Sequence, residues 1–331
     1  MPRQARLDAP GTLHHVIGRG IEGAKIFRTP EDRQDFLTRL GELGEEGAWQ
    51  GYAWALLDNH FHLLVRTGTQ SLAQSMRRLL TGYVVNFNRR YRRYGHLFQN
   101  RYKSIVVEEE PYLLELTRYI HLNPLRAGVV PNMKELRRYP WTGHATLMGQ
   151  KPRTWQEVGA ILSQFGRRKR EARLRYERFV AEGLPLGRRP ELVGGGLVRS
   201  LGGWSEVISL RRTGERSAAD TRILGSGEFV EQMLAQAEER VKATLGWRRR
   251  IPTLAVLADK IARGEGVEPA RLRGRDRKQD TVRARRMLCQ VAVKRLGYAG
   301  AVVARFLGVT TSLANRMASA DEVAGVDRYL R

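Results

Sequence analysis

Hydrophobic and polar positions follow two different periods in the first 150 residues. Short, largely apolar segments predict strands over residues 12–20, 49–59, 60–66 and 101–109. Longer segments with apolar residues at helical spacing predict helices over residues 29–47, 71–95 and 109–124. The order strand, helix, strand, strand, helix, strand is that of a ferredoxin-like split βαβ unit. The pattern therefore predicts an α+β domain with an antiparallel sheet that carries its helices on one face.

The rest of the chain has a different pattern. Residues 155–179 form a highly charged stretch with helical spacing, and residues 183–204, rich in glycine and proline, predict an exposed connector. A helix is expected over residues 227–245, followed by a run of short helices. We therefore divide the chain into a first domain at residues 1–150, a charged helical extension with its connector at 151–245, and an all-α domain at 246–331.

The charge of the chain narrows the class of its partner. It carries 58 lysines and arginines against 34 acidic residues, a formal net charge of +24. Such a field attracts polyanions, and nucleic acid is the first candidate. A packing protein of ribosomal or histone type would be equally basic, so charge alone does not separate an enzyme from a scaffold.

Secretion, membrane insertion and disulfide bonding are disfavoured. The N-terminal segment lacks the apolar core of a signal peptide, and no apolar stretch reaches the roughly 18 residues of a membrane span. The single cysteine, Cys289, excludes internal disulfides and thiolate zinc fingers, and its apolar helical context predicts a buried packing residue. We expect a cytoplasmic, nucleoid-associated protein with no membrane partner.

Candidate chemistry begins with the histidines, all seven of which lie in the first 150 residues. His60 and His62 stand one residue apart in a predicted strand, so both imidazoles should leave the same face. They are either hydrogen-bonded core histidines or a pair that binds one cation, which would polarise a phosphodiester and need a third ligand. His14 and His15 lie on the first predicted strand, where alternation turns one of them to each face.

A nucleophile for phosphodiester chemistry has to be found among the tyrosines. The sequence has no Gly-x-Ser-x-Gly elbow, no reactive cysteine context and no P-loop, whereas a tyrosine phenolate can form a phosphodiester with a DNA end. Eleven tyrosines are present, so composition does not choose one. In the helix over residues 109–124, which Pro124 is expected to end, Tyr119 and Asn123 are four residues apart and share a face. A nucleophile and an oxygen ligand would then lie together over the histidine strand.

Three separated motifs resemble the single-tyrosine HUH transposases, and most closely their REP-associated branch. They are DNHFHLLV, GHLFQNRYKSIVV, and YLLELTRYIHLNPLRAGVV followed by YPWTGH. The resemblance covers about residues 10–150. It implies that His60-Phe61-His62 is the HUH motif, that Tyr119 is the catalytic tyrosine, and that Asn123 is the polar metal ligand one turn beyond it. This chain has asparagine where insertion-sequence members have glutamine.

The resemblance also implies an activity. His60, His62 and Asn123 would hold Mg²⁺ or Mn²⁺, and no nucleotide cofactor would be needed. Tyr119 would attack the scissile phosphate in line and give a 5′-phosphotyrosine and a free 3′-OH. The expected function is site-specific, metal-dependent cleavage and strand transfer of single-stranded DNA at hairpin-forming repeats. The sequence leaves the oligomeric state open.

Cationic residues cluster on the second predicted helix and at the strand that follows it. Arginines alternate there with tyrosines, so phosphates and bases of single-stranded DNA could both be bound. A solvated helix face is the alternative. The residues expected to contact DNA are Arg77, Arg78, Arg89, Arg90, Arg93, Arg101 and Lys103.

Residues 300–319 have the spacing of a helix-turn-helix, with Ala304 at the small position and Gly308 at the turn. With the basic helix before it, this segment resembles the DNA-binding end of the bacterial replication initiator; a helical domain that merely packs is the alternative. The residues that its second helix would present to duplex DNA are Thr310, Thr311, Ser312, Asn315 and Arg316.

Two other classes of function stay open. A non-catalytic, sequence-specific DNA-binding regulator could keep the fold without the chemistry, although His60, His62, Tyr119 and Asn123 are all intact. An RNA-binding or ribosome-associated protein would account for the charge but would leave the histidine pair unused.

Overall fold

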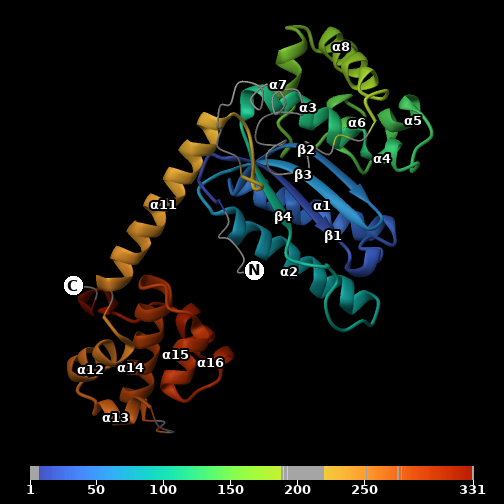
Figure 1. Cartoon of the computed structure of the whole chain (residues 1–331). Helices are drawn as coiled ribbons and strands as arrows, with labels where there is room; N and C mark the ends of the chain where they lie inside the picture. Colours follow the sequence, from blue (N-terminus) through green and yellow to red (C-terminus); the bar gives the residue numbers. More distant parts are fainter. Residues whose placement is uncertain are drawn as a thin grey trace. The chain divides into compact units, whose positions relative to one another are not determined.

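The computed structural model describes residues 7–187, 189, 192, 220–250, 252–273, 276 and 278–329. Their contacts divide the chain into two compact units, residues 1–238 and 239–331 (Figure 1). Most of the predicted connector at 183–204 lies outside the described residues, and the predicted boundary at residue 150 falls inside the first unit.

The first unit is built on a five-stranded sheet of order β2-β3-β1-β4-β5 (Figure 1). The strands are β1 (Leu13–Arg19), β2 (Trp49–Leu57), β3 (His60–Thr67), β4 (Lys103–Val107) and β5 (Ile223–Leu224). The first four pair antiparallel in the ferredoxin-like order, which confirms the predicted α+β class. β5 pairs with β4 in parallel, so the sheet is mixed at one edge rather than wholly antiparallel.

Within the described residues, further segments pair with the outer sides of both β4 and β2. Val106 and Glu108 donate backbone N–H groups to the carbonyls of Arg222 and Leu224 at 2.8 Å each. On the outer side of β2, Leu56 N–H donates to the Trp141 carbonyl at 2.9 Å, and two further bridges join β2 to residues 142 and 156. These bonds occupy backbone groups that an exposed edge would leave unpaired.

Helices α1 (Pro30–Glu45) and α2 (Leu72–Arg90) cover one face of the sheet (Figure 1). Val16, Phe61 and Leu63 lie in the core between this face and the two helices. A capping box at Thr29 and Asp32 begins α1, and Ser71 caps α2 by accepting from Gln74 N–H.

The expectation that all helices lie on one face was wrong, because the opposite face is covered as well. Eight of the nine residues of β2 are buried, and an open face would leave their apolar side chains in water. On this face Leu64 and Ile105 share a core with Leu116 and Ile120 of α3. Its helices are α3 (Glu109–His121), α4 (Asn123–Arg126), α5 (Met133–Arg138), α6 (Gly143–Leu147), α7 (Val158–Leu162) and α8 (Lys169–Glu182). Two 3-10 turns of this unit are η1 (Ile21–Gly23) and η2 (Ser163–Phe165).

The second unit is helical, and α11 (Gly227–Arg250) spans the boundary between the two units. Its further elements are α12 (Leu254–Gly264), α13 (Pro269–Leu272), α14 (Gln279–Cys289), the π-helical turn η4 (Gln290–Arg295), α15 (Gly300–Leu307), α16 (Thr311–Ser319) and the 3-10 turn η5 (Val326–Tyr329). Cys289 is fully buried in the core of this unit, where burial raises the pKa of its thiol to about 11. Across the described residues, no helix combines the length and apolarity that a membrane span requires.

The turn between α15 and α16 has the predicted form. Gly308 ends α15 with φ of 67°, the left-handed conformation that glycine adopts at least cost. Thr310 then caps α16 by accepting from Leu313 N–H at 3.2 Å. Val303, Ala304, Leu307 and Ala314 are buried in the core of the unit, as the helix-turn-helix spacing requires.

Candidate active site

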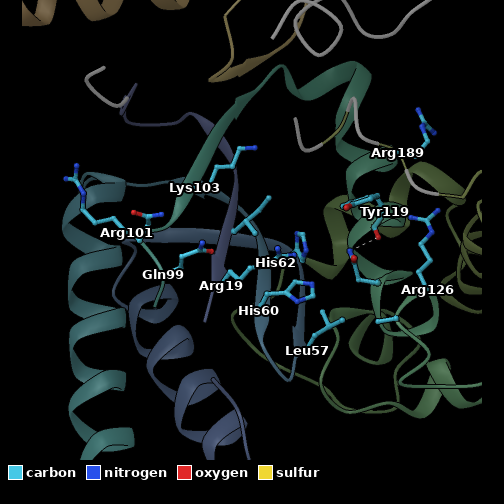
Figure 2. A pocket seen from close by; sticks show the side chains of 14 residues that line it. Arg19, Leu57, His60, His62, Gln99, Arg101, Lys103, Tyr119, Arg126 and Arg189 are labelled. Atoms are coloured by element: carbon cyan, nitrogen blue, oxygen red, sulfur yellow. Dashed lines mark hydrogen bonds between the residues drawn. The ribbon is translucent and has the colours of Figure 1, made fainter. Parts of the chain in front are cut away.

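A pocket of about 730 Å³ lies on the α3 side of the sheet (Figure 2). Its walls bring together residues that are far apart in the sequence, from β1, β3, the segment before β4, α3 and α4. Six of the residues expected at the site from the sequence line it: His60, His62, Arg101, Lys103, Tyr119 and Asn123.

His60 and His62 occupy the same face of β3 and project toward the helix that carries Tyr119 (Figure 2). Their ring centroids are 5.2 Å apart, with the planes at 78°. Phe61 points to the other side, into the core beneath α1 and α2. The alternation of this strand therefore sets two imidazoles side by side at the pocket wall.

Burial keeps both imidazoles neutral. Burial, followed by the charge of Arg19, lowers the pKa of His60 from 6.5 to about 4. The pKa of His62 lies well below 6.5, first because of burial and then because neighbouring positive charge opposes its protonation. A neutral imidazole keeps a lone pair on one nitrogen, which is the form that binds a metal ion.

Each imidazole of the pair has a partner at Nδ1. The contact between His60 Nδ1 and Asn59 Oδ1 is 2.7 Å long, and that between His62 Nδ1 and His15 Nε2 is 2.9 Å long. His15 lies on β1, stacked on His62 with ring centroids 5.2 Å apart. Strand alternation divided His14 and His15 between the two faces; the register of β1 against β3 then puts His15 diagonally beside His62.

Tyr119 and Asn123 form the opposite wall. The Tyr119 ring meets the His62 ring edge-on at a centroid distance of 5.9 Å and the His15 ring at 6.2 Å. α3 ends at His121, two residues before Asn123, and Pro124 opens α4 rather than closing α3. Asn123 Nδ2 donates to the Tyr119 carbonyl at 3.0 Å, so this bond uses the amide nitrogen and leaves the amide oxygen out of it.

These groups form a donor set suited to one cation. The described residues contain no cluster of three or more histidine, cysteine or acidic side chains that would hold a metal by themselves. His60, His62 and Asn123 line one pocket instead, and their imidazole and amide groups are of the types that coordinate a cation. By ligand softness this set suits Mn²⁺ or Zn²⁺ better than Mg²⁺.

Comparison with known proteins assigns this part of the chain. Residues 11–123 match the family model described as "Transposase IS200 like". Over this segment the chain is similar to the IS200-like transposases. The segment includes His15, His60, His62 and Tyr119, and Asn123 is its last residue. The family resemblance inferred from the sequence is therefore confirmed.

One solved structure, that of a REP-associated tyrosine transposase bound to a REP hairpin, is similar to this chain. The two are 15% identical, and the match covers 48% of this chain and 93% of that one with a TM-score of 0.38. No curated protein matches the chain.

Basic residues surround the pocket of the IS200-like domain. Arg101 and Lys103 lie on one side of it, and Arg126 and Arg189 on the other (Figure 2). The Arg126 guanidinium lies 5.5 Å from the centre of the Tyr119 ring, and its Nη2 donates to the Gly183 carbonyl at 2.9 Å. Its Nε and Nη1 are buried and have no hydrogen-bond partner in the described part of the chain.

Arg126 was not among the residues singled out from the sequence. It follows Asn123 by three positions, in the short helix α4. Helical spacing places residues three apart on neighbouring parts of one face, and that was the available signal. The restart of the helix at Asn123, which the sequence did not indicate, carries Arg126 to the pocket.

A second groove of about 800 Å³ lies between α2 and residues 95–102 of the IS200-like domain. It is lined by Arg77 and by apolar side chains that include Leu80, Val84 and Phe98. Gln99, Asn100 and Arg101 line both this groove and the pocket, so the two hollows lie on either side of one short segment.

The other arginines expected to bind DNA have different surroundings. Arg78 forms an ion pair with Glu46, and Arg90 forms one with the fully buried Asp32. The Arg93 guanidinium stacks 5.8 Å from the centre of the Phe87 ring, and Arg89 is exposed. None of these four lines the pocket or the groove.

The five residues expected to bind duplex DNA are exposed on the second unit. Thr310 caps α16, and a Cβ at Gly300 would lie 1.9 Å from Asn315 Oδ1. The Asn315 side-chain oxygen therefore packs against α15, although the residue as a whole is exposed. The resemblance of this segment to the replication initiator stays a prediction.

Proposed function

We propose that this chain is a metal-dependent endonuclease and strand transferase for single-stranded DNA, with Tyr119 as its nucleophile. The observation that supports it most is the meeting of Tyr119, His60, His62 and Asn123 in one basic pocket of an IS200-like domain. A core histidine pair would need neither a tyrosine nor an open pocket beside it.

The proposed reaction needs a divalent cation as its cofactor. A divalent cation, Mn²⁺ or Mg²⁺, held by His60, His62 and Asn123 would polarise a scissile phosphate as a Lewis acid. The neutral state of both imidazoles and the orientation of the Asn123 amide suit these residues to that role. No nucleotide cofactor is needed, because the energy of the cleaved bond is kept in the protein–DNA link.

The chemistry follows from the position of Tyr119. Its Oη attacks the phosphorus, the bond from phosphorus to the 3′ oxygen breaks, and the 5′ phosphate becomes esterified to the tyrosine. The phenolic proton is lost and the departing 3′ oxygen is protonated, so charge and atoms balance. Attack of a 3′-OH on the phosphotyrosine reverses the step and joins a strand. Arg126, with two N–H-bearing nitrogens unpaired beside the ring, is the candidate for binding the negative charge.

The groove beside α2 provides a path for the flanking strand. A single strand that leaves the pocket over Gln99–Arg101 would enter this groove, where Arg77 and Arg101 can bind phosphates. The apolar side chains of Leu80, Val84 and Phe98 offer surfaces for bases. We assign this groove to the strand next to the cleaved phosphate.

The second unit would then bind duplex DNA near the cleavage site. Its exposed Thr311, Ser312 and Arg316 lie on the helix that follows the Gly308 turn. In this proposal the first unit, residues 1–238, carries out cleavage, and the second unit, residues 239–331, recognises duplex DNA. The chain would act on hairpin-forming repeats, as the resemblance to the REP-associated branch implies, in the cytoplasm with the nucleoid.

The test is a denaturing-gel assay on hairpin DNA with a single-stranded flank, labelled at its 3′ end in one sample and its 5′ end in another. With Mn²⁺, the 3′ label should migrate with the protein and the 5′ label with a shorter free strand. Tyr119→Phe and EDTA should each abolish both products, while Tyr112→Phe, on the same helix, should keep them. Hairpin binding without any adduct, over several hairpins and both metals, would favour the non-catalytic DNA-binding regulator.

A further inference from the structure

His15 takes part in the site without lining the pocket. It is fully buried on β1, two ladder positions from the residue that pairs with His62. One of its nitrogens, Nε2, meets His62 Nδ1 at 2.9 Å, and the other, Nδ1, meets the Leu192 carbonyl at 3.4 Å. The imidazole therefore links a backbone carbonyl to one member of the histidine pair.

The carbonyl decides how the protons are placed along this chain of contacts. A carbonyl oxygen only accepts, so His15 Nδ1 carries the proton in the contact with Leu192. We take the fully buried His15 imidazole as neutral, so its one N–H is on Nδ1 and its Nε2 is an acceptor. His62 Nδ1 must then donate to it, and the lone pair of His62 lies on Nε2.

We propose that His15 is a positioning residue that holds His62 as its Nδ1-protonated tautomer and so presents the lone pair of His62 Nε2 to the pocket. Asn59 does the same for His60, because an amide oxygen accepts from His60 Nδ1 at 2.7 Å. Both imidazoles of the pair thus offer Nε2 to one cation. The inference rests on the proposed function, since only a bound cation needs both lone pairs.

His15 and Asn59 impose this order in different ways. Asn59 is the residue next to His60 and is partly exposed, so its contact with His60 depends only on the local hairpin. His15 comes from another strand, 47 residues away, and its ring also stacks on His62 and meets Tyr119 edge-on. It therefore fixes the plane of the His62 ring as well as its proton.

The first experiment measures the tautomer in metal-free protein. Long-range ¹H–¹⁵N correlation of the seven histidines, with His62 assigned from its loss in His62→Gln, reports which nitrogen is protonated. Wild type should show His62 protonated at Nδ1. His15→Phe, which keeps a ring but no acceptor, should shift His62 toward the Nε2-protonated form. His15→Gln, whose amide oxygen can accept, should restore the wild-type signal.

The second experiment measures the affinity for Mn²⁺ alone, from the electron paramagnetic resonance of the free ion. His15→Phe should weaken binding about tenfold, the lower end for loss of a residue that orients a metal ligand. His15→Gln should stay within about threefold of wild type. His14→Gln, a change on the opposite face of the same buried strand, is the matched control for stability and should leave Mn²⁺ affinity unchanged.

Two results would overturn the inference alone: a wild-type His62 protonated at Nε2, or a folded His15→Phe variant that binds Mn²⁺ as tightly as wild type. Failure of the proposed function looks different. Wild type would then bind no Mn²⁺, or His60→Ala would leave Mn²⁺ binding unchanged. In that case the metal site is wrong, and the positioning role of His15 falls with it.

Discussion

The Arg126 guanidinium lies over the ring of Tyr119, 5.5 Å from its centre, and presents two buried nitrogens that have no partner among the described residues. Burial lowers the pKa of Arg126 below its usual range, and Tyr119 opposes that shift. A half-buried guanidinium with two unsatisfied nitrogens is costly, so its position beside a nucleophile needs an explanation. A bound phosphate would satisfy both nitrogens and remove that cost.

We therefore expect Arg126→Gln to slow formation of the covalent adduct about 100-fold, the range typical for loss of one group that binds developing negative charge. Arg126→Lys should recover part of the rate, because it keeps the charge but not the fork of donors. The measurement is single-turnover adduct formation with Mn²⁺. Arg138→Gln, an exposed arginine of α5, is the control for net charge. An unchanged rate in Arg126→Gln would remove this residue from the mechanism.

Arg77 should act on binding rather than on stability. It lines the groove beside α2, where a single strand would place phosphates. Arg77→Ala should lower the slope of log affinity against log salt by about 0.7, the value for one phosphate contact on single-stranded DNA. Its urea midpoint should match that of wild type. A salt slope equal to that of wild type would mean that the strand does not pass this groove.

Arg90 should show the opposite behaviour, although the sequence suggested the same role for both arginines. It pairs with Asp32, whose carboxylate is fully buried and also accepts from Tyr91 Oη at 2.7 Å. Removing a partly exposed partner of a buried carboxylate should cost about 2 kcal/mol, less than for a fully buried pair. We expect Arg90→Ala to lower the free energy of unfolding by this amount, measured in urea. Its affinity for single-stranded DNA should fall no more than that of Arg89→Ala.

His144 should make the first unit less stable in mild acid. It is buried on α6 with both ring nitrogens unpaired among the described residues, and burial, followed by the charge of Arg137, lowers its pKa from 6.5 to about 3. In the unfolded chain His144 binds a proton as pH falls below about 6.5, whereas in the folded chain it does not. The contribution of neutral His144 to the free energy of unfolding is therefore complete above pH 6.5 and is lost as pH falls toward 3.

The size of this effect is about 2 kcal/mol between pH 7 and pH 5. Urea unfolding at these two pH values should show that the wild-type protein loses free energy of unfolding between pH 7 and pH 5. In His144→Leu, which removes the titrating group at similar volume, this loss should be smaller by about 2 kcal/mol. Equal losses in the two proteins would show that His144 is protonated in the folded state.

Duplex recognition should be separable from cleavage. Arg316 is exposed on α16, in the second unit, whereas the pocket lies wholly in the first. Arg316→Ala should weaken binding of a duplex that carries the target site at least tenfold and leave the adduct rate on a short isolated hairpin unchanged. Loss of both activities would contradict the division of labour proposed for the two units.

The local patterns that the sequence carries account for much of this site. Alternation along one strand placed His60 and His62 on one face, and helical spacing brought Tyr119 and Asn123 to one wall of the pocket. The role of each side chain stays a prediction. These features depend on residues close in the sequence, within one strand or across the end of α3 and the start of α4, where periodicity is informative.

Features that depend on pairing between distant segments could not be predicted. The contact of His15 with His62 requires the register of β1 against β3, and β5 reaches the sheet from beyond residue 220. The placement of α3 and the later helices on the second face also escaped the local pattern, because a strand buried on both faces has no polar alternation to count. Arg126 depended on the restart of a helix at Asn123.

The covered edges of the sheet restrict how two copies of this chain can associate. Strand addition needs a row of unpaired N–H and C=O groups. Backbone groups of β4 pair with β5, and backbone groups of β2 pair with residues 141–157. β5 has two residues, too few to template a further strand. Among the described residues, a continuous intermolecular sheet therefore has no place to begin, and a dimer would have to form through helices or loops. The same covering protects a strand-rich domain against aggregation.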